Sequence, residues 1–141
     1  MKLKLIVWHL NRDLAIARGL GSDTEHVRPL VGATCCHNER DEADAKRLWT
    51  ARCYEPVALI DVKVADLPDS GDYHEALEFA FEKTNHINTA WNSAACRTHG
   101  VTALHYENNR STSVGDFVEV IDGESSWVFL CMPAGFKRMA V

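Results

Sequence analysis

Residues 117–132 read FVEVIDGESSWVFLCM and carry the strongest hairpin signal of the chain. The segment 117–121 is apolar with Glu119 interleaved, and the returning segment 127–132 is apolar. Asp122-Gly123 lies between them, and this pair favours a tight turn because glycine readily adopts a positive φ. We therefore expect two antiparallel strands, followed by a short edge strand that begins at Phe136.

Other segments of the chain also have the features of strands. Residues 3–10 open with Leu3, Leu5 and Val7 at alternate positions, which places them on one face of a strand. Three further apolar runs predict strands, the first of them with a bulge at its glycine: residues 30–36, 57–64 and 101–106.

Three segments predict helices. A short one covers residues 12–18, with Asn11 as its cap, and a second covers residues 39–53. The clearest covers residues 72–84, where apolar side chains recur at helical spacing. Its first residue, Asp72, is expected to form a capping box with Glu75.

These elements predict a single globular α+β domain over residues 1–141. We expect a mostly antiparallel sheet of about five strands with helices, chiefly 72–84, packed on one face. The length of 141 residues and the hydrophobic fraction of 46% fit one domain with a substantial core.

The charge of the chain is unevenly distributed. The net charge is −5, which disfavours electrostatic wrapping of nucleic acid. Residues 38–82 hold 12 acidic and 5 basic side chains, whereas the rest of the chain is slightly basic. This division indicates either an acidic face that meets a basic partner or an ordinary solvated surface.

The N-terminus and the cysteines predict the compartment. The short alternating run at the start does not resemble a signal peptide, and no apolar run is long enough to span a bilayer. The five cysteines are an odd number, with Cys35 adjacent to Cys36. We expect a cytoplasmic protein with reduced thiols and no membrane association.

Metal and cofactor chemistry has little support in the sequence. Cys96 and His99 have the spacing of one zinc knuckle, but Cys35 and Cys36 point to opposite faces if they lie in a strand. We expect no bound metal and no cofactor, since nucleotide-binding glycine motifs are absent as well.

The segment RSTSVGD, residues 110–116, forms a loop that admits two interpretations, one functional and one structural. Backbone amides and hydroxyls beside Arg110 are typical of a nest that holds an anion. The same residues also suit a purely structural turn, in which Ser111, Ser113 and Asp116 bond to local backbone. We expect the structural turn, held by Asp116 and the two serines, with Arg110 at least partly exposed. In a purely structural turn Arg110 contributes little to stability, and whether it also binds an anion stays open.

The same segment resembles a known family. The pattern of residues 110–118, an aromatic strand with Trp127 and a late Gly135-Phe136 resemble the YodL-like domains of phages, plasmids and conjugative elements. Upstream, FEKTNHI at residues 81–87, followed by Trp91, is similar to a segment of phage and actinobacterial relatives. The resemblance covers residues 76–136 and implies a mobile-element origin, but it assigns no catalytic residue.

Two functions follow as hypotheses. The first is a phage or mobile-element accessory protein, without enzymatic activity, that binds or inhibits a host protein of a defence or nucleic-acid-handling complex in the host cytoplasm. The second is a small enzyme or anion-binding domain; nucleic-acid binding is a weaker third. For the second, the candidate site lies in two loops and comprises Arg110, Ser111, Ser113, Asp116, Asn85, His86 and Trp91.

Overall fold

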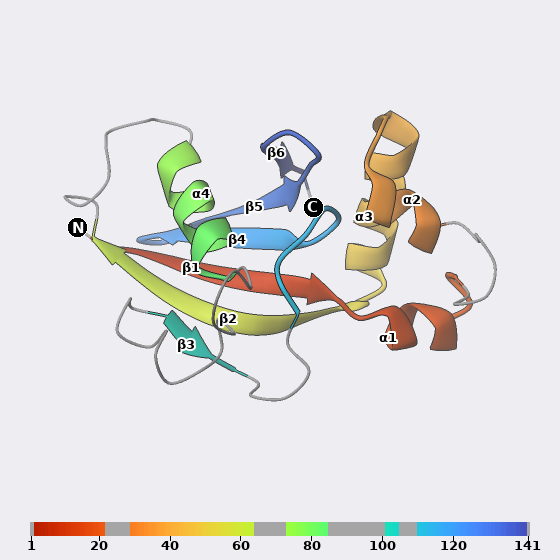
Figure 1. Ribbon diagram of the computed structural model, residues 1–141, viewed down its shortest axis with the longest axis horizontal. Helices are drawn as coiled ribbons and strands as arrows, with labels where there is room; N and C mark the ends of the chain where they lie inside the picture. The colour runs from red at the N-terminus through yellow and green to blue at the C-terminus, as the bar shows by residue number, and fades with distance from the viewer. Residues whose placement is uncertain (1, 22–28, 64–72, 85–100, 105–109, 141) are drawn as a thin grey trace.

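The computed structural model describes residues 2–21, 29–63, 73–84, 101–104 and 110–140 (Figure 1). Within these residues the fold is α+β with one sheet, as predicted, although the sheet has six strands rather than five. The strands are β1 Lys2–Leu10, β2 Tyr54–Lys63, β3 Val101–Ala103, β4 Phe117–Asp122, β5 Ser125–Cys131 and β6 Phe136–Met139. The helices are α1 Arg12–Ala17, α2 Leu30–Cys35, α3 Glu39–Thr50 and α4 His74–Lys83.

The sheet is antiparallel throughout, in the order β3-β2-β1-β4-β5-β6. The N-terminal strand β1 is central and pairs with both β2 and β4. The predicted hairpin is confirmed: β4 and β5 pair around Gly123, whose φ is +63°. Pro56 lies within β2, next to the register shift between Val7 and Trp8, where a proline interrupts the hydrogen-bond ladder least.

One face of the sheet is covered by α4, which lies over its middle strands (Figure 1). The helix begins at His74, with Tyr73 as its N-cap in a left-handed conformation and without a side-chain cap. The predicted start at Asp72 is therefore wrong, and Asp72 itself lies outside the described residues. The core beneath α4 is aliphatic: Leu3, Leu5, Val7, Ile60, Ala76, Leu77, Ala80, Val118 and Val120 are buried there.

The opposite face meets the other helices at one end of the strands (Figure 1). Phe117 and Leu130 are paired across β4 and β5 and point away from α4, because alternate residues of a strand face opposite sides. They pack with Leu48 of α3 and Leu30 of α2 in a second core. The 110–116 loop lies at this end of the sheet, between the two cores.

The predicted strand at 30–36 is wrong, because Leu30–Cys35 forms helix α2. A short, mostly apolar run does not distinguish a buried strand from a buried helix. Two local features favour the helix here. Pro29 presets a helical φ at its N-cap, and Cys36 ends the helix in a left-handed conformation with a φ of +49°.

Candidate functional site

The 110–116 loop is organised around Asp116, whose side chain is 1% exposed. The two terminal nitrogens of Arg110 donate to its two carboxylate oxygens at 2.5 and 2.6 Å. The backbone amides of Leu10 and Ser113 donate to the same carboxylate at 2.9 and 2.8 Å. These donors converge on one buried charge and fix the loop to the end of β1.

The guanidinium of Arg110 is also used within the protein. It donates to the carbonyls of Ser111 and Leu10 and to the hydroxyl of Ser113, at 3.0, 3.3 and 3.2 Å. Burial lowers the pKa of Arg110, but the hydrogen bond and charge of Asp116 outweigh it and leave the pKa raised. Although the side chain is 43% exposed, both terminal nitrogens already donate hydrogen bonds to acceptors within the protein.

A buried chain of polar side chains continues from this pair. The Nε2 atom of His9 lies 3.9 Å from Asp116 and 2.9 Å from the hydroxyl of Thr112. The Thr112 hydroxyl lies 2.6 Å from that of Thr84, which donates to the carbonyl of Ala80 at 2.8 Å. The chain links β1, the loop and the end of α4, and each of its polar groups has a partner.

Gly115 allows the loop to approach the backbone of α2 closely. Its φ is +94°, and an added Cβ would lie 2.3 Å from the carbonyl oxygen of Ala33. The hydroxyl of Tyr54 donates to the Gly115 carbonyl at 2.6 Å. Burial, followed by the charge of Asp116, raises the pKa of Tyr54 well above its ordinary value, so the hydroxyl remains a neutral donor.

A cavity of about 360 Å³ opens beside the loop. Its lining includes Arg12, Arg110, Thr34 and Ser113. The exposed Arg12 is the second cation beside this cavity, and its side chain extends from the first turn of α1. Two guanidinium groups on one cavity are compatible with an anion, although the hydroxyl of Thr34 already donates within α2.

Asn85, His86 and Trp91, the sequence-predicted residues of the second loop, lie outside the described residues. The structure brings together Arg110, Ser111, Ser113 and Asp116 of the first loop. His9 and Thr112 complete this cluster and were missed by the sequence analysis. The signal for His9 was its position, because it continues the alternation of Leu3, Leu5 and Val7 onto the buried face of β1.

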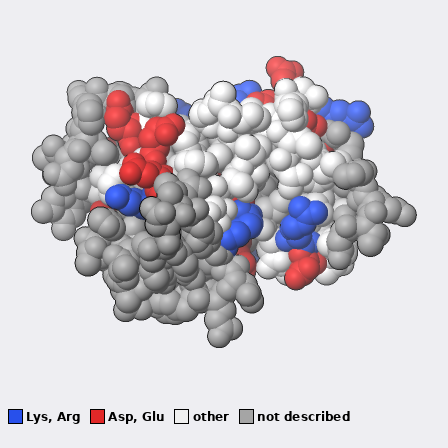
Figure 2. Space-filling view, in the orientation of Figure 1, with Lys and Arg blue, Asp and Glu red and all other residues white. Residues whose placement is uncertain are grey.

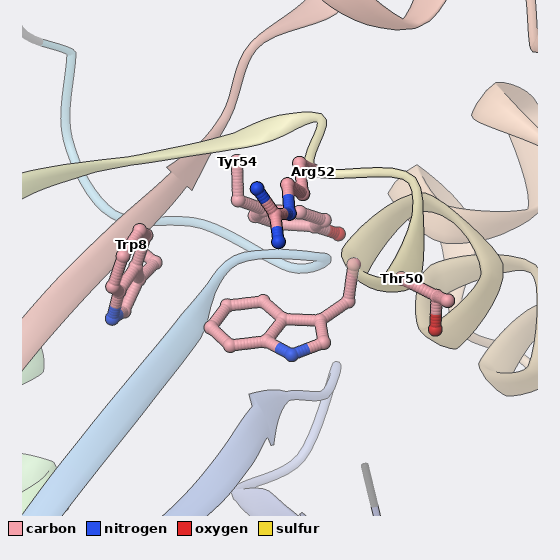
Figure 3. A pocket seen from close by; sticks show the side chains of 5 residues that line it. Trp8, Thr50, Arg52 and Tyr54 are labelled. Atoms are coloured by element: carbon pink, nitrogen blue, oxygen red, sulfur yellow. The ribbon is translucent and has the colours of Figure 1, made fainter.

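A larger cavity, of about 530 Å³, lies between β1 and the end of α3 (Figure 3). Trp8, Trp49 and Tyr54 form its aromatic lining, together with Thr50 and Arg52. The rings of Trp8 and Trp49 meet edge to face, with centroids 5.3 Å apart. No spacing in the sequence indicates this cavity, because its three aromatic side chains come from three separate elements.

Contacts with neighbouring side chains fix the two indole rings of this cavity. Trp49 packs on Phe117 and Tyr54, with centroids 4.7 and 5.6 Å away. The indole nitrogen of Trp8 donates to Glu119 at 3.3 Å. Both indoles are partly exposed and supported by the second core, so the cavity is a preformed apolar surface.

Arg52 occupies an unusual backbone position at the rim. Its φ is +59°, and its amide donates to the Trp49 carbonyl while the Cys53 amide donates to that of Leu48, each at 3.0 Å. This is the Schellman arrangement that ends α3, in which the left-handed position is usually glycine. An arginine there carries a conformational cost and places a guanidinium beside the aromatic rings (Figure 3).

Within the described residues, the acidic side chains of α3 and of α4 are placed differently. On α3, Asp41 and Glu42 are buried: Asp41 accepts from the His37 amide at 2.9 Å, and Glu42 pairs with Lys137 at 3.0 Å. On α4, acidic side chains gather at the surface, as Figure 2 shows. They are Glu75, Glu78 and Glu82, which share one helical face.

The thiols form no candidate metal centre within the part of the chain that the structure describes. Cys35, Cys36, Cys53 and Cys131 are unpaired, and Cys96 lies outside that part. Burial, with the charges of Asp41 and Glu42, raises the pKa of Cys36 to about 12. Burial, with Asp116, raises that of Cys131 to about 12 as well. These two thiols are therefore protonated and weakly nucleophilic at neutral pH.

The comparisons with known proteins add no relative. The chain matches no protein-family model, no curated protein and no solved structure at a significant level. None of the helices in the described residues is long and apolar enough to cross a membrane.

Proposed function

We propose that this chain is a non-enzymatic protein-binding module of a phage or other mobile element, and that it acts on a host protein in the cytoplasm. The observation that carries the binding role is the aromatic cavity of Trp8, Trp49, Thr50, Arg52 and Tyr54. Tryptophan, tyrosine and arginine are the residue types that dominate binding hot spots. The mobile-element origin rests on the resemblance of residues 76–136 to YodL-like domains.

The chemistry of the cavity favours binding over catalysis. Of its described lining residues, none is a carboxylate, an imidazole or a thiol. The hydroxyl of Thr50 donates to the carbonyl of Lys46 at 3.0 Å, and that of Tyr54 is held by Gly115. Neither hydroxyl has a general base beside it in this lining, so the residues offer apolar surface and one positive charge.

The expected occupant is an apolar side chain of the partner. The cavity volume lies within the usual range for preformed ligand pockets. Burying about 100 Å² of apolar surface there would contribute about 2.5 kcal/mol to the free energy of binding. One anchor of this kind, with polar contacts around it, is the usual arrangement of a small interface.

The acidic face of α4 supports a protein partner but does not define the contact. Glu75, Glu78 and Glu82 would steer a basic surface by long-range attraction, which mainly raises the association rate. An anchor is needed for a specific complex, and α4 offers none among these three side chains. We therefore place the principal contact at the aromatic cavity.

A second candidate function is anion binding at the cavity beside Arg110. Two arginines on one cavity favour it. The ion pair with Asp116 weighs against it, because the terminal nitrogens of Arg110 are already engaged. Experiments can distinguish the two functions, because a peptide with an apolar anchor tests protein binding and phosphate tests anion binding.

The test is a selection from a displayed library of random 12-residue peptides on the wild-type protein. The control is the variant Thr50→Tyr, in which the added ring fills the aromatic cavity. Thr102→Tyr is the matched variant, since Thr102 is an exposed threonine on β3 outside the cavity. We expect enriched peptides with a shared apolar anchor that bind wild type and Thr102→Tyr but not Thr50→Tyr.

Two results would contradict the proposal. One is a selection that enriches no sequence above the background of unselected peptides. The other is a set of peptides that bind Thr50→Tyr as tightly as wild type, because their site then lies elsewhere. Circular dichroism of both variants establishes that the tyrosines leave the fold intact.

A further inference from the structure

Arg52 has a backbone that a glycine would occupy more easily. Its left-handed conformation, with φ of +59°, is one that residues with a Cβ rarely adopt. The hydrogen bonds that end α3 need this conformation but make no use of the side chain. The arginine therefore needs an explanation beyond the end of the helix.

The Arg52 side chain is exposed, and the described residues supply its guanidinium with no hydrogen bond or ion pair. Figure 3 shows it beside Tyr54, on the side of the cavity that faces the end of α3. The exposed Lys46 and Arg47 line a neighbouring hollow on α3, not this cavity. Among its described lining residues the cavity thus has three aromatic rings and one cation, Arg52, although the chain as a whole is acidic.

We propose that Arg52 makes the aromatic cavity select a partner segment in which a carboxylate follows the apolar anchor. This inference rests on the proposed function, because it names the sequence feature that the same cavity recognises. The anchor fills the cavity that Trp8, Trp49 and Tyr54 line, and the carboxylate accepts from the guanidinium in the planar geometry that arginine favours. An arginine without a partner among the described residues, placed beside a preformed apolar site, is a specificity device of this kind.

A nucleotide also combines a flat ring with negative charge, but the rest of the surface favours a peptide. The net charge of −5 and the acidic stripe of α4 repel a polyanion. A single carboxylate needs only the local positive charge of Arg52. Nucleotide binding is thus an outcome that the experiment must detect.

The experiment titrates two capped peptides, Gly-Phe-Asp-Gly and Gly-Phe-Asn-Gly, into the labelled protein. Binding is followed by the indole N–H signals of Trp8 and Trp49 in two-dimensional NMR spectra. We expect the aspartate peptide to bind wild type about fivefold more tightly than its amide twin, and the ratio to fall in high salt. Arg52→Gly should reduce the ratio to about one, and Arg52→Lys should keep part of it.

Each outcome bears on a different step. Equal binding of the twins to wild type overturns the role of Arg52 and leaves the cavity as a binding site. A ratio that survives in Arg52→Gly also overturns that role. If neither peptide moves either indole signal at 10 mM, the proposed function itself fails with the inference. If adenosine monophosphate moves these signals at lower concentration than the aspartate peptide, the ligand is a nucleotide and the peptide assignment is wrong.

Discussion

Arg110 and Asp116 form a two-pronged ion pair in which each terminal nitrogen of the guanidinium meets a different carboxylate oxygen, at 2.5 and 2.6 Å. The carboxylate is buried, while the arginine side chain is 43% exposed. The pair therefore closes the 110–116 loop from the solvent side and fixes it to the first strand.

Removal of either member should destabilise the fold, and to different extents. Asp116→Ala leaves the buried amide of Leu10 and the partly buried amide of Ser113 without their acceptor and should cost about 3 kcal/mol. Arg110→Ala leaves the buried carboxylate without its charge partner, and we expect about 1–2 kcal/mol, more than the sequence alone suggested. Urea denaturation measures both, with the exposed Ser126→Ala as a control. Unchanged stability of Asp116→Ala would mean that the loop does not brace the fold.

Gly115→Ala should be more damaging than the same change at Gly135. Both glycines have a positive φ, +94° and +87°, so both alanines carry backbone strain of about 1 kcal/mol. Only at Gly115 does the new Cβ meet a backbone atom, the carbonyl oxygen of Ala33, at 2.3 Å. We expect thermal unfolding to show a loss for Gly115→Ala at least twice that for Gly135→Ala. Equal losses would mean that α2 moves away from the loop at no cost.

Phosphate should not stabilise the protein through the cavity beside Arg12. Because Asp116 already engages Arg110, we expect 10 mM phosphate to shift the melting temperature of wild type and Arg12→Ala equally. Differential scanning fluorimetry at constant ionic strength measures the two shifts. A larger shift in wild type than in Arg12→Ala would support the anion-binding function instead.

The two buried thiols should be nearly inert in the native state. With the pKa raised from 9.0 to about 12, the thiolate fraction of Cys36 and Cys131 at pH 8 falls by about a thousandfold. Iodoacetamide labelling followed by mass spectrometry should modify the partly exposed Cys35 long before either of them. Comparable labelling rates for the three would contradict this burial.

The same shifts predict the direction of a pH effect on stability. A folded-state pKa above the unfolded value favours the native state fully below pH 9, and this stabilisation is lost as the pH rises from 9 toward 12. Cys36→Ala should therefore show a shallower loss of unfolding free energy above pH 9 than wild type. An identical slope for the two proteins would exclude a contribution from Cys36.

Arg52→Gly should stabilise the protein by about 1 kcal/mol, because glycine adopts the left-handed conformation without strain. Chemical denaturation measures the gain, and Arg52→Ala, which keeps the strain, is the matched control. A gain in Arg52→Ala equal to that in Arg52→Gly would place the cost in the charge of the side chain rather than in its backbone.

The sequence predicts much of the fold because most elements have strong local signals. Alternation identifies β1, Asp122-Gly123 identifies the hairpin, and Asn11 caps α1 as expected, accepting from the Leu14 amide at 3.1 Å. The segment 30–35 is mispredicted because it is short and mostly apolar, and such a run shows no period that distinguishes a strand from a helix. Local signals therefore suffice where an element has a clear period, cap or turn.

The candidate sites were less accessible to prediction. The 110–116 loop is contiguous, so its residues stand together in the sequence. The aromatic cavity collects Trp8 from β1, Trp49 from α3 and Tyr54 from β2, and no spacing rule connects them. Arg52 stands out by its left-handed backbone conformation, and this conformation cannot be inferred from the residue type.

The most direct test of the binding account is the NMR response of the tryptophan side chains to the best peptide from the library selection. Trp127 is an internal reference, because it packs under Arg138 at 3.8 Å on the α4 face of the sheet. We expect the indole signals of Trp8 and Trp49 to shift with a common dissociation constant while that of Trp127 stays in place. A titration that shifts Trp127 and leaves Trp8 and Trp49 unmoved would contradict the assignment of the aromatic cavity as the binding site.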